Sequence, residues 1–157
     1  NGGAAFGDGA RAYGTNATAL GPNAIASHSG AVAIGDGSLT SAMNTVSFGS
    51  AGNERRLMNV AMGILGTDAV NVDQLNRAVT GLNRGIAATT ALATPMLALE
   101  RGETGFAVGG GYYEGEAGVA FRVAHEMDLE TPVLLSAGYS TAGGQTGAAQ
   151  VGLAFKF

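Results

Sequence analysis

The sequence predicts a mainly β protein with one long α-helix. Three patterns support this fold class. Glycine recurs every seven residues through about the first fifty residues, apolar residues follow a 3-4 spacing between residues 72 and 96, and bulky and small residues alternate strictly after residue 105. The first pattern is typical of a β-solenoid, the second of a coiled-coil helix, and the third of sheet strands. The patterns follow one another along the chain, so we expect separate modules in that order.

The glycine repeat predicts a stack of short strands joined by tight turns. A small residue stands two positions before each glycine, and a turn former stands two positions after it. Those turns require a positive φ, so each rung is a short strand plus a left-handed turn, with two seven-residue units per coil. His28 and Ala42 interrupt the glycine series; we expect His28 to be a surface residue rather than a metal ligand. The turn positions are Gly9, Asn16, Asn23, Gly30, Gly37 and Asn44.

The alternating C-terminal region predicts four strands with two unlike faces. One face is bulky and apolar, whereas the other is mostly Gly, Ala and Ser, which is the pattern of an outer-membrane β-barrel. The polar residues that also point inward are Arg122, Glu126, Gln150 and Lys156. They pair with each other or with helix backbone, or they only solvate the rims of the lumen, which is what we expect for Lys156. The predicted lipid-facing residues are Phe106, Val108, Tyr112, Val119, Phe121, Val123, Val133, Leu135, Tyr139, Val151, Leu153 and Phe155. The predicted lumen-facing small residues are Ala107, Gly109, Gly111, Gly118, Ala120, Ala124, Gly138, Gly152 and Ala154.

Four strands cannot close a barrel, since the smallest known kind needs about eight. An open edge in lipid leaves backbone groups unpaired at several kcal/mol each, so either the chain oligomerises or the membrane interpretation is wrong. Three copies would give a 12-stranded barrel that is wide enough to hold other segments.

The 3-4 spacing predicts a helix from Val70 to about Leu99, capped by Thr67 or Asp68 and ended near Pro95. Gly81 and Gly85 weaken this helix by about 1 kcal/mol each relative to alanine. Residues 85–93 are small on all sides, which suits three helices running inside the barrel. A helix lying on the membrane would need a Lys/Arg row, which is missing. The seam begins at Val72 and ends at Met96; its predicted core is Leu75, Val79, Leu82, Ile86, Thr89 and Ala93.

Composition narrows the function classes. The 157 residues include 27 glycines and no cysteine, only 13% are charged, and the net charge is −4. Low charge argues against both a soluble enzyme and a disordered tail, and the absence of a basic cluster beyond Arg55–Arg56 argues against nucleic-acid binding. No nucleophile–base pair stands out, and two isolated histidines do not make a metal site. We therefore expect no enzyme activity, no cofactor and no metal.

The motifs together resemble one family. The repeat A-x-A-x-G-x-x, seen at residues 10–16, resembles the YadA-like head of trimeric autotransporter adhesins. Residues 55–63 and 67–75 are similar to the neck of that family, and residues 102–157 to its membrane anchor. The terminal Phe157 resembles the signal that the barrel-assembly machinery reads. The neck positions that match are Arg55, Asn59, Val60, Ala61, Gly63, Asp68, Ala69, Val70, Asn71, Val72, Gln74 and Leu75.

The resemblance implies a left-handed parallel β-roll head, a trimeric coiled-coil stalk, and a barrel formed by three chains with their helices inside. It implies a head at 1–52, a neck at 53–75, a stalk and pore-filling helix at 76–101, and an anchor at 102–157. The neck would cross to neighbouring subunits, with Asn59 and Asn71 satisfying backbone groups there; a capped helix start without crossing is the alternative. The implied neck and trimer contacts are Arg55, Asn59, Asp68, Val70, Asn71, Val72 and Gln74.

The implied function is adhesion by a homotrimer in the outer membrane of a Gram-negative bacterium. The anchor would contact lipid and the barrel-assembly machinery and support export, while the surface-exposed head attaches to host matrix, host cells or other bacteria. A non-adhesive structural or protective surface protein is one alternative. An ice-binding solenoid is another, but Thr15, Thr18 and Thr40 stand out of register. Because the chain opens inside a repeat, we expect a mature or trimmed product.

Overall fold

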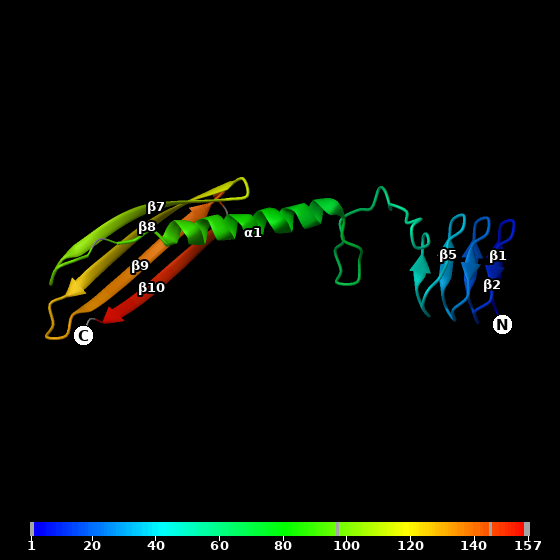
Figure 1. Ribbon diagram of the computed structural model, residues 1–157, viewed down its shortest axis with the longest axis horizontal. Helices are drawn as coiled ribbons and strands as arrows, with labels where there is room; N and C mark the ends of the chain where they lie inside the picture. The colour runs from blue at the N-terminus through cyan, green and yellow to red at the C-terminus, as the bar shows by residue number, and fades with distance from the viewer. Residues whose placement is uncertain (1, 97, 145, 156–157) are drawn as a thin grey trace. The chain divides into compact units, whose positions relative to one another are not determined.

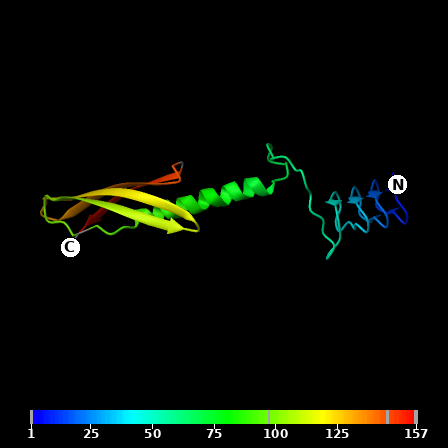
Figure 2. The same ribbon diagram turned by 90° about the horizontal axis from the view of Figure 1, so that it is seen from above.

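The computed structural model describes residues 2–96, 98–144 and 146–155, and the chain divides into two compact units, Asn1–Val60 and Ala61–Phe157 (Figures 1 and 2). Each unit is described by itself. Within the described residues, no helix is both long and apolar enough to cross a membrane.

The first unit is a parallel β-solenoid. Residues 5, 19, 33 and 47 occupy equivalent positions on successive parallel strands, so one coil takes 14 residues. The predicted two seven-residue units per coil are therefore confirmed. One sheet consists of β1 (Ala4–Phe6), β3 (Thr18–Leu20), β5 (Val32–Ile34) and β6 (Val46–Ser47), and the other of β2 (Arg11–Ala12) and β4 (Ile25–Ala26) (Figure 1).

The turns adopt the left-handed conformation that the sequence predicts, at all six predicted positions. The φ values are 68° at Gly9, 55° at Asn16, 52° at Asn23, 63° at Gly30, 61° at Gly37 and 56° at Asn44. Glycine and asparagine alternate from coil to coil, because each asparagine side chain fills the space beside the glycine one coil earlier. A Cβ added to Gly9 would stand 2.6 Å from Asn23 Oδ1, so a larger residue would collide there.

The interior of the solenoid is narrow and made of alanine. In the last coil, Ser38 and Thr40 occupy the positions equivalent to Ala24 and Ala26, because Leu39 pairs in parallel with Ile25. Both hydroxyls are satisfied, since Ser38 Oγ donates to the Ile34 carbonyl at 2.6 Å and Thr40 Oγ1 accepts from the Ser27 amide at 3.0 Å. The fully buried alanines are Ala17, Ala19, Ala24, Ala26, Ala31 and Ala33.

His28 does not interrupt the coil, which continues through β4 and β5. Its side chain is half-buried, and Nδ1 lies 3.2 Å from Thr40 Oγ1. The ring therefore stays partly exposed at the surface of the solenoid and packs beside Thr40 of the neighbouring coil.

The described part of the second unit contains one helix, α1 (Val72–Leu92), and the predicted range from Val70 to Leu99 was too long. Asn71, not Thr67 or Asp68, is its N-cap. The Asn71 side chain accepts from the Gln74 amide, and the Gln74 side chain accepts from the Asn71 amide, which is a capping box. The helix ends at Leu92 with Ala93 as its C-cap, because Pro95 disfavours a helical conformation at the preceding residue.

The four predicted strands form an antiparallel meander in the order β10-β9-β8-β7. The C-terminal half of α1 packs on one face of this sheet, and its N-terminal half extends beyond the strands (Figures 1 and 2). Within the described residues, β7 and β10 each pair along one edge only. The strands are β7 (Thr104–Tyr113), β8 (Glu116–Met127), β9 (Val133–Ala142) and β10 (Thr146–Phe155).

Candidate assembly surfaces

Small residues bring the sheet into close contact with α1. A Cβ added to Gly109 or Gly111 would collide with helix backbone, and one on Gly118 would stand 2.7 Å from the Ala87 carbonyl oxygen. Ala120 packs in a cluster with Ala91 and Leu92. The helix therefore fits because these strand residues lack larger side chains.

The remaining predicted inward positions are less uniform. A Cβ on Gly138 would stand 3.0 Å from Leu92 Cδ2, whereas Gly152 lies beside Ser136 Oγ on the neighbouring strand. Ala107 is half-buried, Ala124 is buried and Ala154 is exposed. That these positions face the lumen of a barrel stays a prediction.

Arg122 connects the sheet to the end of the helix. Its Nη1 donates to the Leu92 carbonyl at 3.2 Å and to the Thr94 carbonyl at 2.6 Å. These are carbonyls that a helix leaves unsatisfied at its C-terminus, where a positive charge also complements the helix dipole. We predicted that Arg122 pairs either with another inward-pointing polar residue or with helix backbone, and these contacts are with the backbone. Lys156, predicted to lie at the rim, falls outside the described residues.

A second charged contact joins helix and sheet at the other end of the packed segment. Arg84 Nε lies 2.9 Å from Glu116 Oε2. The sequence analysis missed this pair, because 32 residues separate its members and no periodic pattern links them. The hint in the sequence was an arginine directly before the small-residue stretch of the helix at residues 85–93.

The opposite face of the sheet is bulky, apolar and uncovered in the single chain. Strand pairing places Val108, Phe121 and Tyr139 in one row across three strands. Val151 is 77% exposed and Phe106 is 67% exposed, and the rings of Phe106 and Phe121 stack with centroids 5.8 Å apart. Among the predicted lipid-facing residues, Val123 and Val133 are half-buried and the others are exposed. Contact with lipid stays a prediction for all of them.

The predicted coiled-coil seam is also uncovered. Along α1, Leu75 is 58% exposed and Leu82 is 68% exposed, and Val72, Val79 and Ile86 are exposed with them. Thr89 Oγ1 donates to the carbonyls of Gly85 and Ile86 within the same helix. The helical seam is shorter than predicted, since Ala93 is the C-cap and Met96 lies beyond it.

The neck segment folds back on the start of α1. Gln74 Oε1 accepts from the Gly63 amide at 2.8 Å, and its Nε2 donates to the Gly63 carbonyl at 3.0 Å. Asp68 Oδ2 accepts from the amides of Leu65 and Ile64, both at 2.9 Å. These hydrogen bonds lower the pKa of Asp68, that from Leu65 first and that from Ile64 second. Asp68 therefore closes a turn before the helix and does not cap it.

The other predicted neck contacts lie at the surface of the single chain. Val70 and Val72 are exposed, and Asn59 adopts a left-handed φ of 60°. Asn71 and Gln74 are engaged within their own chain. Contacts of these residues with neighbouring subunits stay a prediction.

Arg55, predicted to contact a neighbouring subunit, closes the last coil of its own solenoid. Nη1 donates to the Phe48 carbonyl at 2.7 Å and Nη2 donates to the Asp36 carbonyl at 2.6 Å. Nη1 also lies 3.0 Å from Ser38 Oγ, the hydroxyl buried inside that coil. Terminal coils of solenoids need such polar caps, because no further coil covers them.

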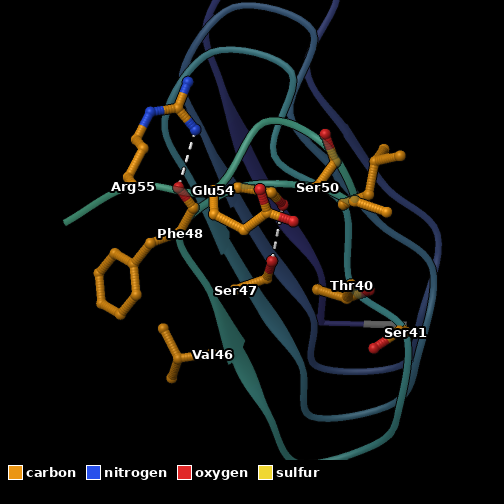
Figure 3. A pocket seen from close by; sticks show the side chains of 11 residues that line it. Thr40, Ser41, Val46, Ser47, Phe48, Ser50, Glu54 and Arg55 are labelled. Atoms are coloured by element: carbon orange, nitrogen blue, oxygen red, sulfur yellow. Dashed lines mark hydrogen bonds between the residues drawn. The ribbon is translucent and has the colours of Figure 1, made fainter.

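A cleft of about 660 Å³ opens beside this cap. Figure 3 shows Thr40 and Ser41 on one side of it and Val46 and Phe48 on the other. Glu54 also lines the cleft, and Glu54 Oε1 accepts from the Gly52 amide at 2.9 Å. Backbone hydrogen bonds, first from Glu54 itself and then from Gly52, lower the pKa of this carboxyl group. No cluster of three or more His, Asp or Glu suited to a metal occurs in the described part of the chain.

Two family models match the chain. One, described as the coiled stalk of trimeric autotransporter adhesins, matches residues 56–98, and one described as the YadA head domain repeat matches residues 1–24, 12–38 and 26–51. Among solved structures, the crystal structure of the collagen-binding domain of the Yersinia adhesin YadA is similar, with 38% identity and a TM-score of 0.49. The match covers 51% of this chain and 46% of that one, so the chain spans less than half of that structure.

Proposed function

Because the chain belongs to the YadA-like trimeric autotransporter adhesins, we propose that three copies form an outer-membrane anchor that displays the head at the surface of a Gram-negative cell. The family is one of adhesins and not of enzymes. We propose the head at 1–52, the neck at 53–75, the stalk and pore-filling helix at 76–101, and the anchor at 102–157.

One observation carries the proposal for the anchor: α1 covers the small-residue face of the sheet and leaves the bulky apolar face open. A soluble sheet would bury its bulky face, whereas a membrane barrel turns that face to lipid. The edges of β7 and β10 are the two edges at which neighbouring copies would join. Three such sheets close into 12 strands, with three helices inside and no unpaired edge in lipid.

The exposed seam of α1 supports a trimeric stalk above the anchor. Val72, Leu75, Val79 and Leu82 recur at the 3-4 spacing at which helices of a coiled coil meet. Three helices that converge in this way would bury a seam that a single chain leaves in water. The same trimer would bring the neck contacts of Val70, Asn71 and Gln74 next to neighbouring subunits.

The proposed role of the anchor includes support of export, after which the head remains attached. Delivery to the barrel-assembly machinery would use the terminal Phe157, which lies outside the described residues. The proposed role of the head is attachment to host matrix, host cells or other bacteria. The binding of collagen is a property named for the Yersinia domain. For this chain, collagen is one of the host-matrix ligands to be tested.

The anchor is tested by expressing the full chain in a Gram-negative host and running the outer-membrane fraction on SDS gels without heating. We expect a band at about three times the 15.5 kDa mass of the chain, which boiling or strong denaturant converts to the monomer. A stable monomer in detergent before heating would contradict the proposed barrel.

The adhesive role is tested on cells that display either the full chain or a chain without residues 2–52. Attachment of both strains is measured on surfaces coated with collagen, with other matrix proteins or with host cells. Attachment between bacteria is measured by mixing cells of each strain. We expect attachment only with the full chain. Equal attachment by the two strains at matched surface levels would instead support a spacing or protective role for the head.

A further inference from the structure

An ion pair lies where α1 leaves the sheet. Arg84 Nε is 2.9 Å from Glu116 Oε2, and the two side chains are 30% and 23% exposed. Arg84 stands one turn before Ala87 and Ala88, the first residues of the helix that are buried against the strands. Glu116 is the first residue of β8. The pair therefore marks the end of the helix–sheet contact.

Arg84 also packs against a second turn at the same end of the sheet. A Cβ on Gly143, in the turn between β9 and β10, would stand 2.7 Å from Arg84 Cζ. Gly143 has a φ of 59°, so glycine is required there both by the backbone and by the arginine. One side chain of the helix thus contacts both the β7–β8 end and the β9–β10 turn.

On the C-terminal side of Arg84, the contact between small residues of the helix and of the sheet fixes the position of the helix along its axis only weakly. Ala87 and Ala91 are four residues apart and lie on the same face, so a shift of one helical turn replaces one alanine by another. The strands opposite offer Gly109, Gly111 and Gly118, which are equally small. The alanines and glycines alone give little preference between these positions. A shift of about 5 Å would separate Arg84 from Glu116 at one end of the packed segment, and at the other end it would move Leu92 away from Ala120 and the Leu92 and Thr94 carbonyls away from Arg122.

We infer that Arg84 is a positioning residue that sets the axial register of α1 on the sheet, through its pair with Glu116 and its packing against Gly143. This inference rests on the proposed anchor, in which α1 is the segment that occupies the barrel once the head is outside. The register set by Arg84 is then the position at which the exported chain comes to rest.

The test measures the access of a thiol reagent to the packed part of the helix. The chain has no cysteine, so Ala87→Cys introduces a single thiol at a position that is fully buried against the sheet. Outer-membrane trimers that carry this change are treated with a membrane-impermeant maleimide, and the labelling rate is measured. We expect Arg84→Glu or Glu116→Arg to raise that rate roughly fivefold, which is the effect of losing one partly exposed ion pair.

The charge swap separates positioning from a general loss of stability. In the double variant Arg84→Glu/Glu116→Arg, the pair is restored with reversed charges, and labelling should return to the slow rate. Arg77→Glu is the matched control, since Arg77 is an exposed arginine of the same helix whose guanidinium lies 3.7 Å from Met62 Sδ and far along the chain from Ala87. It should leave the labelling rate unchanged.

An unchanged labelling rate in Arg84→Glu, or a swap that fails to restore protection, would overturn the inference. If Arg84→Glu does not assemble, Arg84→Gln removes the pair without repulsion and carries the same test. Failure of the proposed anchor is seen separately, in the parent protein, as the absence of an SDS-resistant trimer from the outer membrane.

Discussion

The Nη1 atom of Arg122 lies 2.6 Å from the carbonyl oxygen of Thr94, two residues beyond the end of α1. The same nitrogen reaches Leu92, so a strand residue serves as the C-terminal partner of the helix. A helix that ends without glycine or a basic residue of its own needs such a partner, because its last carbonyls are otherwise unsatisfied.

Arg122→Ala should therefore destabilise the packed helix. Hydrogen bonds to a charged group contribute about 1.5–3 kcal/mol, and partial exposure of Arg122 places the expected loss at the lower end of that range. The measurement is the temperature at which the SDS-resistant trimer dissociates, which should fall. The dissociation temperature should fall less in Arg122→Lys, because lysine keeps the positive charge but bonds both carbonyls less well than arginine does. An unchanged dissociation temperature in Arg122→Ala would show that these hydrogen bonds are dispensable.

Gly109→Trp and Ala120→Trp should prevent assembly. Both positions lie against the helix, where even a Cβ on Gly109 would collide with Ala91 and Thr94. Val119→Leu is the matched control, since Val119 is exposed on the opposite face of the same strand. Surface level of the head and yield of SDS-resistant trimer are the measurements. Normal display of both tryptophan variants would refute the packing of α1 inside the proposed barrel.

Asp68 should make the neck turn sensitive to acid. Its pKa is lowered in the folded chain, so its contribution to stability is present above the ordinary value of 3.8 and is lost as the pH falls below that value through the folded pKa. Protonation weakens the hydrogen bonds from Ile64 and Leu65, so the protection of these amides, expressed as the exchange rate relative to the intrinsic rate at the same pH, should fall in acid. Hydrogen exchange measured between pH 6 and about pH 3 checks this. Asp68→Asn should show no such step, and a step that survives in that variant would assign it to another group.

Two turn glycines of the head should respond differently to alanine. Gly9→Ala combines an unfavourable φ with a collision against Asn23 Oδ1, whereas Gly37→Ala meets nothing within 4 Å and has only the unfavourable φ of 61°. The left-handed conformation costs roughly 1–2 kcal/mol for a residue with a Cβ. We expect the thermal unfolding of the head, followed by circular dichroism, to shift in both variants and further in Gly9→Ala. Equal shifts would mean that the coils relax around the added methyl group.

The repeat and the strands were predictable from the sequence because their periods are set by the backbone. A left-handed turn accepts glycine or asparagine and little else, so Asn16 and Gly30 identify their own conformation. The alternation of Val119 and Ala120 likewise fixes which face of β8 meets the helix. Conformational preferences of this kind depend on a few consecutive residues, so the sequence alone predicts them.

The limits of α1 and its charged partners were less predictable. Thr67 and Asp68 look like caps, but the reciprocal bonds between Asn71 and Gln74 satisfy two amides at once and begin the helix later. The pair of Arg84 with Glu116 depends on the tertiary packing of a helix on a strand. No local pattern in the sequence encodes such a contact, so only the folded chain reveals it.

The alternation of glycine and asparagine along the stacked turns restricts how a head of this type can lengthen. Residues 2, 16, 30 and 44 read Gly, Asn, Gly, Asn, and each asparagine occupies the room that the glycine below it leaves. Duplicating a single coil would set two asparagines one above the other and drive a Cβ into a side-chain oxygen. Duplicating two coils together preserves the sequence of partners, so growth by gene duplication is tolerated in pairs of coils.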